Sequence, residues 1–154
     1  MDHRGTILEA LGIQVVHADS DRVVCTMPVD ERTMQPMGVL HGGASVVLAE
    51  TAASLGTYLQ IDHETEMSFG MEINANHVRS ASSGTVTATA VPLHKGRTSM
   101  VWDIRITDEQ GRLICVSRCT VAIVKKRGKN EAGDTLEHIT EQMATAADSN
   151  PGGA

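Results

Sequence analysis

Aromatic residues are nearly missing from this sequence: Tyr58, Phe69 and Trp102 are the only three among 154 residues. The core must therefore be aliphatic, with some of the eight Met residues filling irregular gaps. No apolar run reaches the roughly 18 residues that a membrane span requires. The polar start of the chain also lacks the apolar stretch of a signal peptide. We therefore expect no membrane segment and a cytoplasmic location.

Basic residues and cysteine are also scarce. The 13 Lys and Arg residues are outnumbered by 19 Asp and Glu residues, which gives a net charge of -6. This charge argues against a broad nucleic-acid-binding face, but it does not exclude an anionic ligand held by a local basic cluster. The three cysteines, Cys25, Cys115 and Cys119, form no C-x-x-C pair. We interpret them as reduced, buried residues and predict no metal site.

What remains is the composition of one ordinary globular domain, 41% hydrophobic and 21% charged. Thr6 and Glu9 form a capping box that predicts a short helix ending near Gly12. Segments rich in Val, Ile and Thr predict strands at residues 13–17, 22–27, 71–78, 85–91, 99–107 and 113–124. The first two should form a hairpin, and the last four are spaced as in an antiparallel meander. The stretch between the hairpin and residue 39 is expected to be a loop.

Residues 42–59 predict a buried helix, because they are apolar or small nearly all round and lack Pro, Lys and Arg. The pattern indicates an α+β fold in which one antiparallel sheet of five to six strands wraps around this long central helix. Such a sheet leaves an edge or a face that a partner usually covers. We assign this domain to residues 1–125. Residues 126–154 form a polar extension, in which a second capping box predicts a short helix at 135–147.

Two features of the central helix could carry chemistry. Gly42 and Gly43 expose backbone N–H groups at its positively polarised start, where a developing oxyanion would be stabilised. Glu50 is the only charge on the helix, and a buried carboxylate is costly unless it is partnered or functional. An ordinary glycine-rich helix start and a structural Glu satisfied by the backbone or by a partner chain remain the alternatives.

The spacing between these features adds a constraint. Eight residues of helix place Gly42 and Glu50 about 12 Å apart, whereas one carbonyl must lie about 3 Å from both its donor and its attacking group. One helix is therefore unsuited to supply both, but two antiparallel copies could do so. If both residues are catalytic, the active site lies between two subunits.

Six stretches of the sequence, taken together, resemble a known family. They are residues 35–38 (QPMG), 40–45 (LHGGAS), 48–50 (LAE), 73–79 (INANHVR), 92–97 (PLHKGR) and 108–113 (DEQGRL). In this order and at these intervals they resemble the hotdog-fold acyl-CoA thioesterases of the phenylacetate and Arthrobacter-type 4-hydroxybenzoyl-CoA branch. That branch includes 1,4-dihydroxy-2-naphthoyl-CoA hydrolase. The resemblance extends over about residues 5 to 125.

The resemblance implies hydrolysis of an aromatic or arylacetyl-CoA thioester to the free acid and CoA. Glu50 would be the nucleophile or the general base, and the Gly42 N–H would polarise the thioester carbonyl. Gln35 would hydrogen-bond at the acyl carbonyl or position water, and Ser54 would help to place the hydrolytic water. His41 would orient the thioester or the helix start, with a purely structural role as the alternative.

The resemblance also implies where the substrate binds. The residues expected to contact substrate or CoA are Gly43, Asn76, His77, Arg79, Lys95, Gly96, Arg97 and Thr98. We expect the basic members to form one cluster for the CoA phosphates, although solvated charges at strand ends are the alternative. Methionines and Phe69 could line the acyl pocket or simply pack the core. Coenzyme A is part of the substrate, so no separate cofactor is expected, and the assembly should be at least a homodimer, with a dimer-of-dimers tetramer anticipated.

Two other functions are compatible with parts of the pattern. A hotdog 3-hydroxyacyl-thioester dehydratase also uses a His and an acidic residue across a dimer, but here Glu50 follows His41 too closely for that arrangement. A non-catalytic acyl-CoA-binding module is disfavoured because Gln35, Gly42 and Glu50 are all present. Release of free CoA would separate hydrolysis from both.

Overall fold

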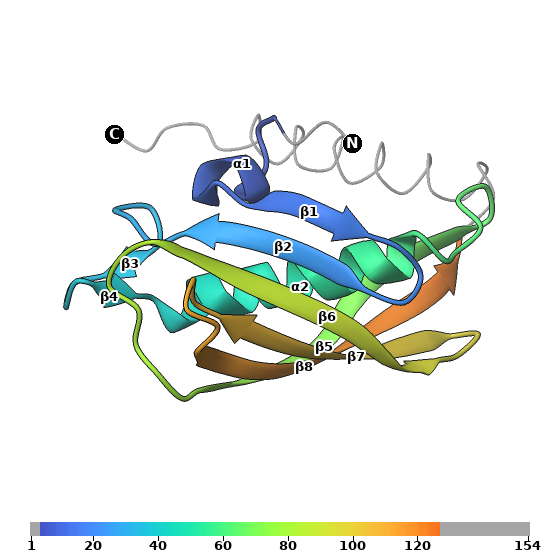
Figure 1. Ribbon diagram of the computed structural model, residues 1–154. Coiled ribbons are helices and arrows are strands. Elements are labelled where there is room, and N and C mark those ends of the chain that lie inside the picture. The colour runs from blue at the N-terminus through green and yellow to red at the C-terminus, as the bar shows by residue number, and fades with distance from the viewer. Residues whose placement is uncertain (1–3, 127–154) are drawn as a thin grey trace, which may run out of the picture. The chain divides into compact units, whose positions relative to one another are not determined.

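The computed structural model describes residues 4–126 and shows two helices and eight strands in that range (Figure 1). The helices are α1 (Ile7–Leu11) and α2 (Gly42–Tyr58). The strands are β1 (Gln14–Ala18), β2 (Val23–Pro28), β3 (Met34–Gln35), β4 (Val39–Leu40), β5 (Glu66–His77), β6 (Thr85–Lys95), β7 (Ser99–Thr107) and β8 (Leu113–Lys125). The helix predicted at 135–147 lies outside the described residues.

Six strands form one sheet in the order β1-β2-β6-β7-β8-β5. The pairs β1–β2, β2–β6, β6–β7 and β7–β8 are antiparallel. The strands β6 to β8 form the expected meander, but β5 does not precede it in space. Instead β5 lies at the far edge beside β8, and β2 takes the place next to β6. The hotdog prediction of one sheet and one long helix is confirmed, and the four-strand meander is corrected.

The helix α2 packs along the inner face of this sheet (Figure 1). Strand residues that point inward are fully buried, as in the alternation of Val23, Cys25 and Met27 along β2. Helix and sheet approach closely at Gly56, where a Cβ would collide with the ring of Trp102. The Trp102 Nε1–H donates a hydrogen bond of 2.9 Å to Thr57 Oγ1 in the same layer, so the indole is both packed and satisfied.

Three local predictions differ from the structure. The strand expected at 71–78 begins earlier, at Glu66, and the loop expected at 28–39 contains the short β3–β4 hairpin. The capping box at α1 differs from the expected pattern: the Thr6 side chain makes no cap hydrogen bond, and Glu9 Oε2 accepts at 2.6 Å from the N–H of Gly5, one residue before the N-cap. Gly12 ends α1 at a φ of 67°, in the left-handed region that favours glycine.

Neither helix in residues 4–126 is both long enough and apolar enough to cross a membrane.

Candidate active site

The start of α2 leaves one backbone donor free. His41 is the N-cap residue, and its Nδ1 accepts a hydrogen bond of 2.8 Å from the Gly43 N–H. The N–H groups of Ala44 and Ser45 both reach the His41 carbonyl oxygen. Among residues 4–126, the Gly42 N–H has no hydrogen-bond partner. The Gly42 N–H, at the positive end of the helix dipole, is thus available to a ligand.

His41 therefore has a structural role as the N-cap of α2. Because Nδ1 accepts a hydrogen bond, a neutral His41 carries its proton on Nε2, which remains a donor. Gly43, which we expected to contact substrate, already uses its N–H on this ring. A side chain at this position would be tight, since a Cβ at Gly43 would lie 3.0 Å from His41 Nδ1.

A cavity of about 390 Å³ opens beside the start of α2 and collects several of the predicted residues. Gln35 on β3, Gly42, His77 at the end of β5, and Arg79 all line it. The His77 ring packs against Gly42, because a Cβ at Gly42 would lie 2.8 Å from His77 Nε2. This donor end presents an amide, a free N–H, an imidazole and a guanidinium to one space, which suits an anionic or strongly polarised ligand.

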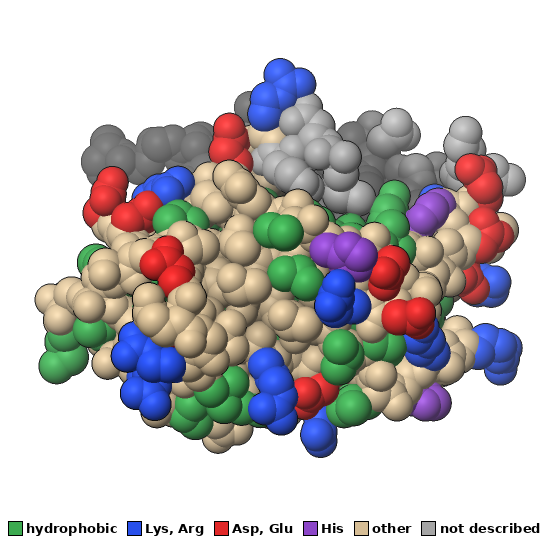
Figure 2. All heavy atoms as spheres, viewed as in Figure 1, with side chains coloured by type: hydrophobic (Ala, Val, Ile, Leu, Met, Phe, Trp, Pro, Cys, Tyr) green, Lys and Arg blue, Asp and Glu red, His purple; other side chains and the backbone are tan. Residues whose placement is uncertain are grey.

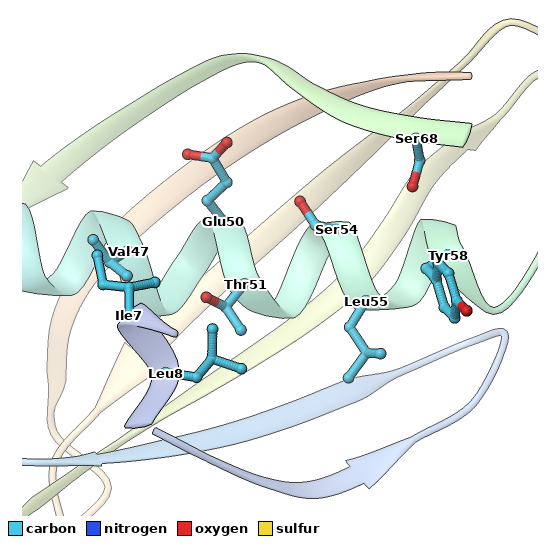
Figure 3. Close-up of a pocket in the computed structure, with 9 residues that line it drawn as sticks. All are labelled: Ile7, Leu8, Val47, Glu50, Thr51, Ser54, Leu55, Tyr58 and Ser68. Atoms are coloured by element: carbon cyan, nitrogen blue, oxygen red, sulfur yellow. The ribbon is translucent and has the colours of Figure 1, made fainter. Parts of the chain in front are cut away.

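Glu50 and Ser54 line a second cavity, of about 480 Å³, whose other lining residues are mostly apolar (Figure 3). Both side chains point from α2 toward β5 in Figure 3. Glu50 is half-buried and has no hydrogen bond or ion pair within the described part of the chain. An unpaired carboxylate in apolar surroundings is available to attack a carbonyl or to take a proton from water.

The walls of this second cavity differ from our expectation. Ile7 and Leu8 of α1 close one side, and Leu55 and Tyr58 of α2 extend the cavity along the helix (Figure 3). The residues that we expected as a possible acyl lining do not line it in a single chain; these are Met34, Met37, Met67, Phe69 and Met71. The apolar character of α1 could have suggested its role, but a helix of five residues gives a weak periodic signal.

The predicted catalytic residues therefore form two separate groups in the structure. Gln35, His41 and Gly42 lie at the start of α2, and Glu50 and Ser54 lie two to three turns further along. The helical rise keeps Gly42 and Glu50 about 12 Å apart. A single chain thus holds a donor end and a carboxylate end, and neither alone can polarise and attack one carbonyl.

The predicted basic cluster is not formed within one chain. Lys95 of β6 lies opposite Met100, at one end of β7. The Val78 and Arg79 N–H groups donate to the Ile114 carbonyl oxygen, which lies near the opposite end of β7. The intervening length of β7 separates the two groups by about 20 Å, since a strand rises about 3.3 Å per residue. On the face shown in Figure 2, Lys and Arg side chains are likewise scattered rather than gathered.

The members of that cluster have different surroundings. Lys95 Nζ forms an ion pair of 2.9 Å with Asp21 Oδ1. Gly96 lies in the turn between β6 and β7, where its N–H donates to the Ser99 carbonyl oxygen at 3.0 Å. Arg97 and Thr98 are exposed in the same turn, and Asn76 is exposed on β5. No group of three or more His, Cys, Asp or Glu side chains in residues 4–126 is arranged to hold a metal ion.

Comparison with known proteins now identifies the family. Residues 37–115 match the thioesterase superfamily. The 1,4-dihydroxy-2-naphthoyl-CoA hydrolase of Listeria monocytogenes is 50% identical over 119 residues, which cover 77% of this chain and 96% of that protein. The proofreading thioesterase EntH of Cronobacter turicensis is 48% identical over 120 residues, covering 78% and 87% of the two chains. A crystal structure of a mutant of thioesterase PA1618 from Pseudomonas aeruginosa superposes with a TM-score of 0.79 at 45% identity, covering 80% of this chain and 89% of that one.

The chain belongs to the thioesterase superfamily and has its hotdog fold. It is a thioester hydrolase that acts on acyl-CoA-like thioesters, as the resemblance implied. Hydrolysis is thereby favoured over both alternatives, the dehydratase and the binding module without turnover.

Proposed function

We propose that the protein is an acyl-CoA thioesterase for aromatic or arylacetyl-CoA substrates, with an active site built by two copies of the chain. The observation that carries this proposal is the division of the site. Within residues 4–126, one chain offers a Gly42 N–H without a partner at the start of α2 and a Glu50 carboxylate without a partner near the middle of this helix. Two copies arranged antiparallel would bring Gly42 of one chain to Glu50 of the other and form two complete sites.

In this proposal the donor end holds the thioester. The Gly42 N–H, assisted by Gln35, binds the carbonyl oxygen and stabilises the oxyanion that forms on attack. His77 and Arg79, which share that cavity, lie on the CoA side. The Lys95–Thr98 turn contributes further CoA contacts, and its distance from His77 within one chain favours contacts to the CoA bound at a neighbouring subunit.

Glu50 of the partner subunit carries out the chemistry in one of two ways. As a nucleophile it forms a mixed anhydride with the acyl group and expels the CoA thiolate, and water then hydrolyses the anhydride. As a general base it removes a proton from a water held by Ser54, and that water attacks the carbonyl carbon. Both routes yield the free acid and CoA, and both require an unpaired carboxylate beside the carbonyl.

The exposed apolar side chains of the edge strand β5 favour a dimer interface along this strand. Met67, Phe69 and Met71 expose 38%, 55% and 67% of their surface along it. Long edge strands with exposed apolar side chains rarely remain uncovered in soluble proteins. Since β5 also borders the Glu50 cavity through Ser68, a partner docked on this edge lies next to the carboxylate end. A dimer-of-dimers tetramer would leave this interface intact.

Charge at the β5 edge should therefore break the assembly. We expect Met71→Lys to shift the protein to monomers and to lower activity at least about tenfold, because an ammonium group buried against a partner is not solvated. Analytical ultracentrifugation and CoA release at equal chain concentration measure the two effects. Val16→Lys, on the opposite edge strand and 63% exposed, is the matched control and should change neither. A fully active Met71→Lys monomer would contradict the two-chain site.

The acyl preference is tested with a substrate panel, reading released CoA with a thiol reagent. Burial raises the pKa of Cys25 to about 11 and that of Cys119 to about 12, so these native thiols stay protonated near pH 8 and give little background. We expect benzoyl-, phenylacetyl- or hydroxynaphthoyl-CoA to exceed straight-chain acyl-CoA of similar size in kcat/KM by about tenfold or more. Preference for straight chains would refute the aromatic assignment, and absence of CoA release from every substrate would refute the thioesterase.

A further inference from the structure

Gly70 of β5 lies directly against the Glu50 carboxylate. A Cβ built on Gly70 would collide with Glu50 Oε1 and would lie 3.0 Å from Glu50 Cδ and 3.5 Å from Cγ. The carboxylate thus fills the space that any side chain at position 70 would need.

The backbone does not explain why glycine stands at this position. Gly70 is not among the glycines with positive φ, so its conformation is open to any residue. Glycine also weakens a strand interior, because it costs more backbone entropy and offers no side chain to pack. A glycine with no conformational reason, in the middle of a 12-residue strand, often marks a close approach of another group. Here the approaching group is the Glu50 carboxylate.

Packing must position this carboxylate, because no hydrogen bond or ion pair from residues 4–126 does so. Its neighbours on the sheet side are strand residues. A small displacement of the Glu50 head group would move it away from the cavity that it shares with Ser54.

We infer that Gly70 is a positioning residue for catalysis: its missing Cβ lets the Glu50 carboxylate lie against β5 in the orientation that reaches the thioester. The inference rests on the proposed role of Glu50. It adds a required glycine on β5, the strand that packs against Glu50, which the catalytic residues alone do not indicate.

The variant Gly70→Ala tests this directly. A methyl group at this position forces Glu50 into another rotamer, and a displacement of about 1 Å at a reacting group can cost about 100-fold in rate. We expect kcat to fall about 100-fold while KM changes less than about threefold, since the CoA and acyl contacts are untouched. Trp102 fluorescence during thermal unfolding shows whether the variant folds, and a non-hydrolysable acyl-CoA thioether shows whether it still binds.

The double variant Gly70→Ala/Glu50→Asp separates positioning from a general disturbance of the strand. Aspartate is shorter by one methylene, so its carboxylate avoids the new methyl group. We expect the loss in kcat of the double variant to be smaller than the product of the two single losses. If Gly70→Ala alone fails to fold, relief of the clash predicts that the double variant folds.

Several results would overturn the inference: kcat of Gly70→Ala within about twofold of wild type, losses that simply multiply, or failure of both variants to fold. Glu50→Ala, measured in the same series, keeps this failure distinct from failure of the proposed function. If Glu50→Ala loses activity while Gly70→Ala keeps full activity, only the role of Gly70 is refuted. If both variants keep full activity, the role proposed for Glu50 is refuted as well.

Discussion

Glu50→Gln is expected to lower kcat at least about 1,000-fold, because an amide of the same shape can neither attack a thioester nor accept a proton from water. The substitution suits the site. Glu50 makes no ion pair within the described residues, so no cation loses its partner. The glutamine amide also fits the space left by Gly70. The free energy of unfolding should therefore change by about 1 kcal/mol or less, and the loss can be assigned to chemistry.

Steady-state CoA release on the best aryl-CoA of the panel measures the effect. Ser54→Ala is the matched comparison in the same cavity, and it should lose much less, since water can be placed without the hydroxyl. Single-turnover experiments on the Ser54 variant would also look for a covalent acyl intermediate, which the nucleophilic route forms and the general-base route does not. Retention of wild-type kcat by Glu50→Gln would contradict both routes.

Gly42→Pro is expected to lower kcat by about 100- to 1,000-fold, the usual cost of removing one oxyanion donor. Proline is tolerated at the first position of a helix, where its missing N–H breaks no helical bond. His41 already has the extended conformation that a following proline requires, with φ -71° and ψ 132°. The substitution therefore deletes the one N–H that has no partner at the start of α2 among residues 4–126, and leaves the helix in place.

Gly42→Ala is the control for this variant. It keeps the N–H but adds a Cβ that crowds the His77 ring at 2.8 Å from Nε2, as proline also would. The difference between Pro and Ala thus reports the loss of the N–H together with the proline ring atoms that take the place of its hydrogen. Circular dichroism checks the helix content of both. If the two variants lost the same activity, crowding of His77 would be the cause and the Gly42 N–H would not be the oxyanion donor.

Much of the fold was predictable because its segments are long and clearly bounded. The stretch that became α2 is long, apolar nearly all round and free of Pro, and turn residues separate the β-branched runs of β6 to β8. The start of β5 was missed because residues 66–70 (EMSFG) follow a polar loop and contain no Val, Ile or Thr, the residues on which the strand predictions rested. The apolar side chains of this part of β5, Met67, Phe69 and Met71, are exposed rather than packed in the core. Sheet order escaped prediction because it depends on long-range pairing, which local spacing does not encode.

The candidate site was likewise predictable only where local spacing or sequence resemblance determines it. The separation of Gly42 from Glu50 followed from helix geometry, whereas the roles of Gln35 and Ser54 were implied by the resemblance. Gln35 and Gly42 line one cavity, and Glu50 and Ser54 line the other. The acyl wall formed by α1 and the separation of Lys95 from His77 could not be inferred, because both depend on where distant segments meet. Gly70 could not be found either, since its role appears only when the Glu50 carboxylate is placed against it.

The central claim is that each active site combines Gly42 of one chain with Glu50 of its partner, and mixing two inactive variants tests it most directly. Gly42→Pro and Glu50→Gln chains, unfolded and refolded together in equal amounts, should form mixed dimers that contain one intact and one doubly altered site. If half of the dimers are mixed, the account predicts recovery of about one quarter of wild-type activity. Activity that stays at the level of the two separate variants, with mixed dimers shown by mass spectrometry, would contradict it.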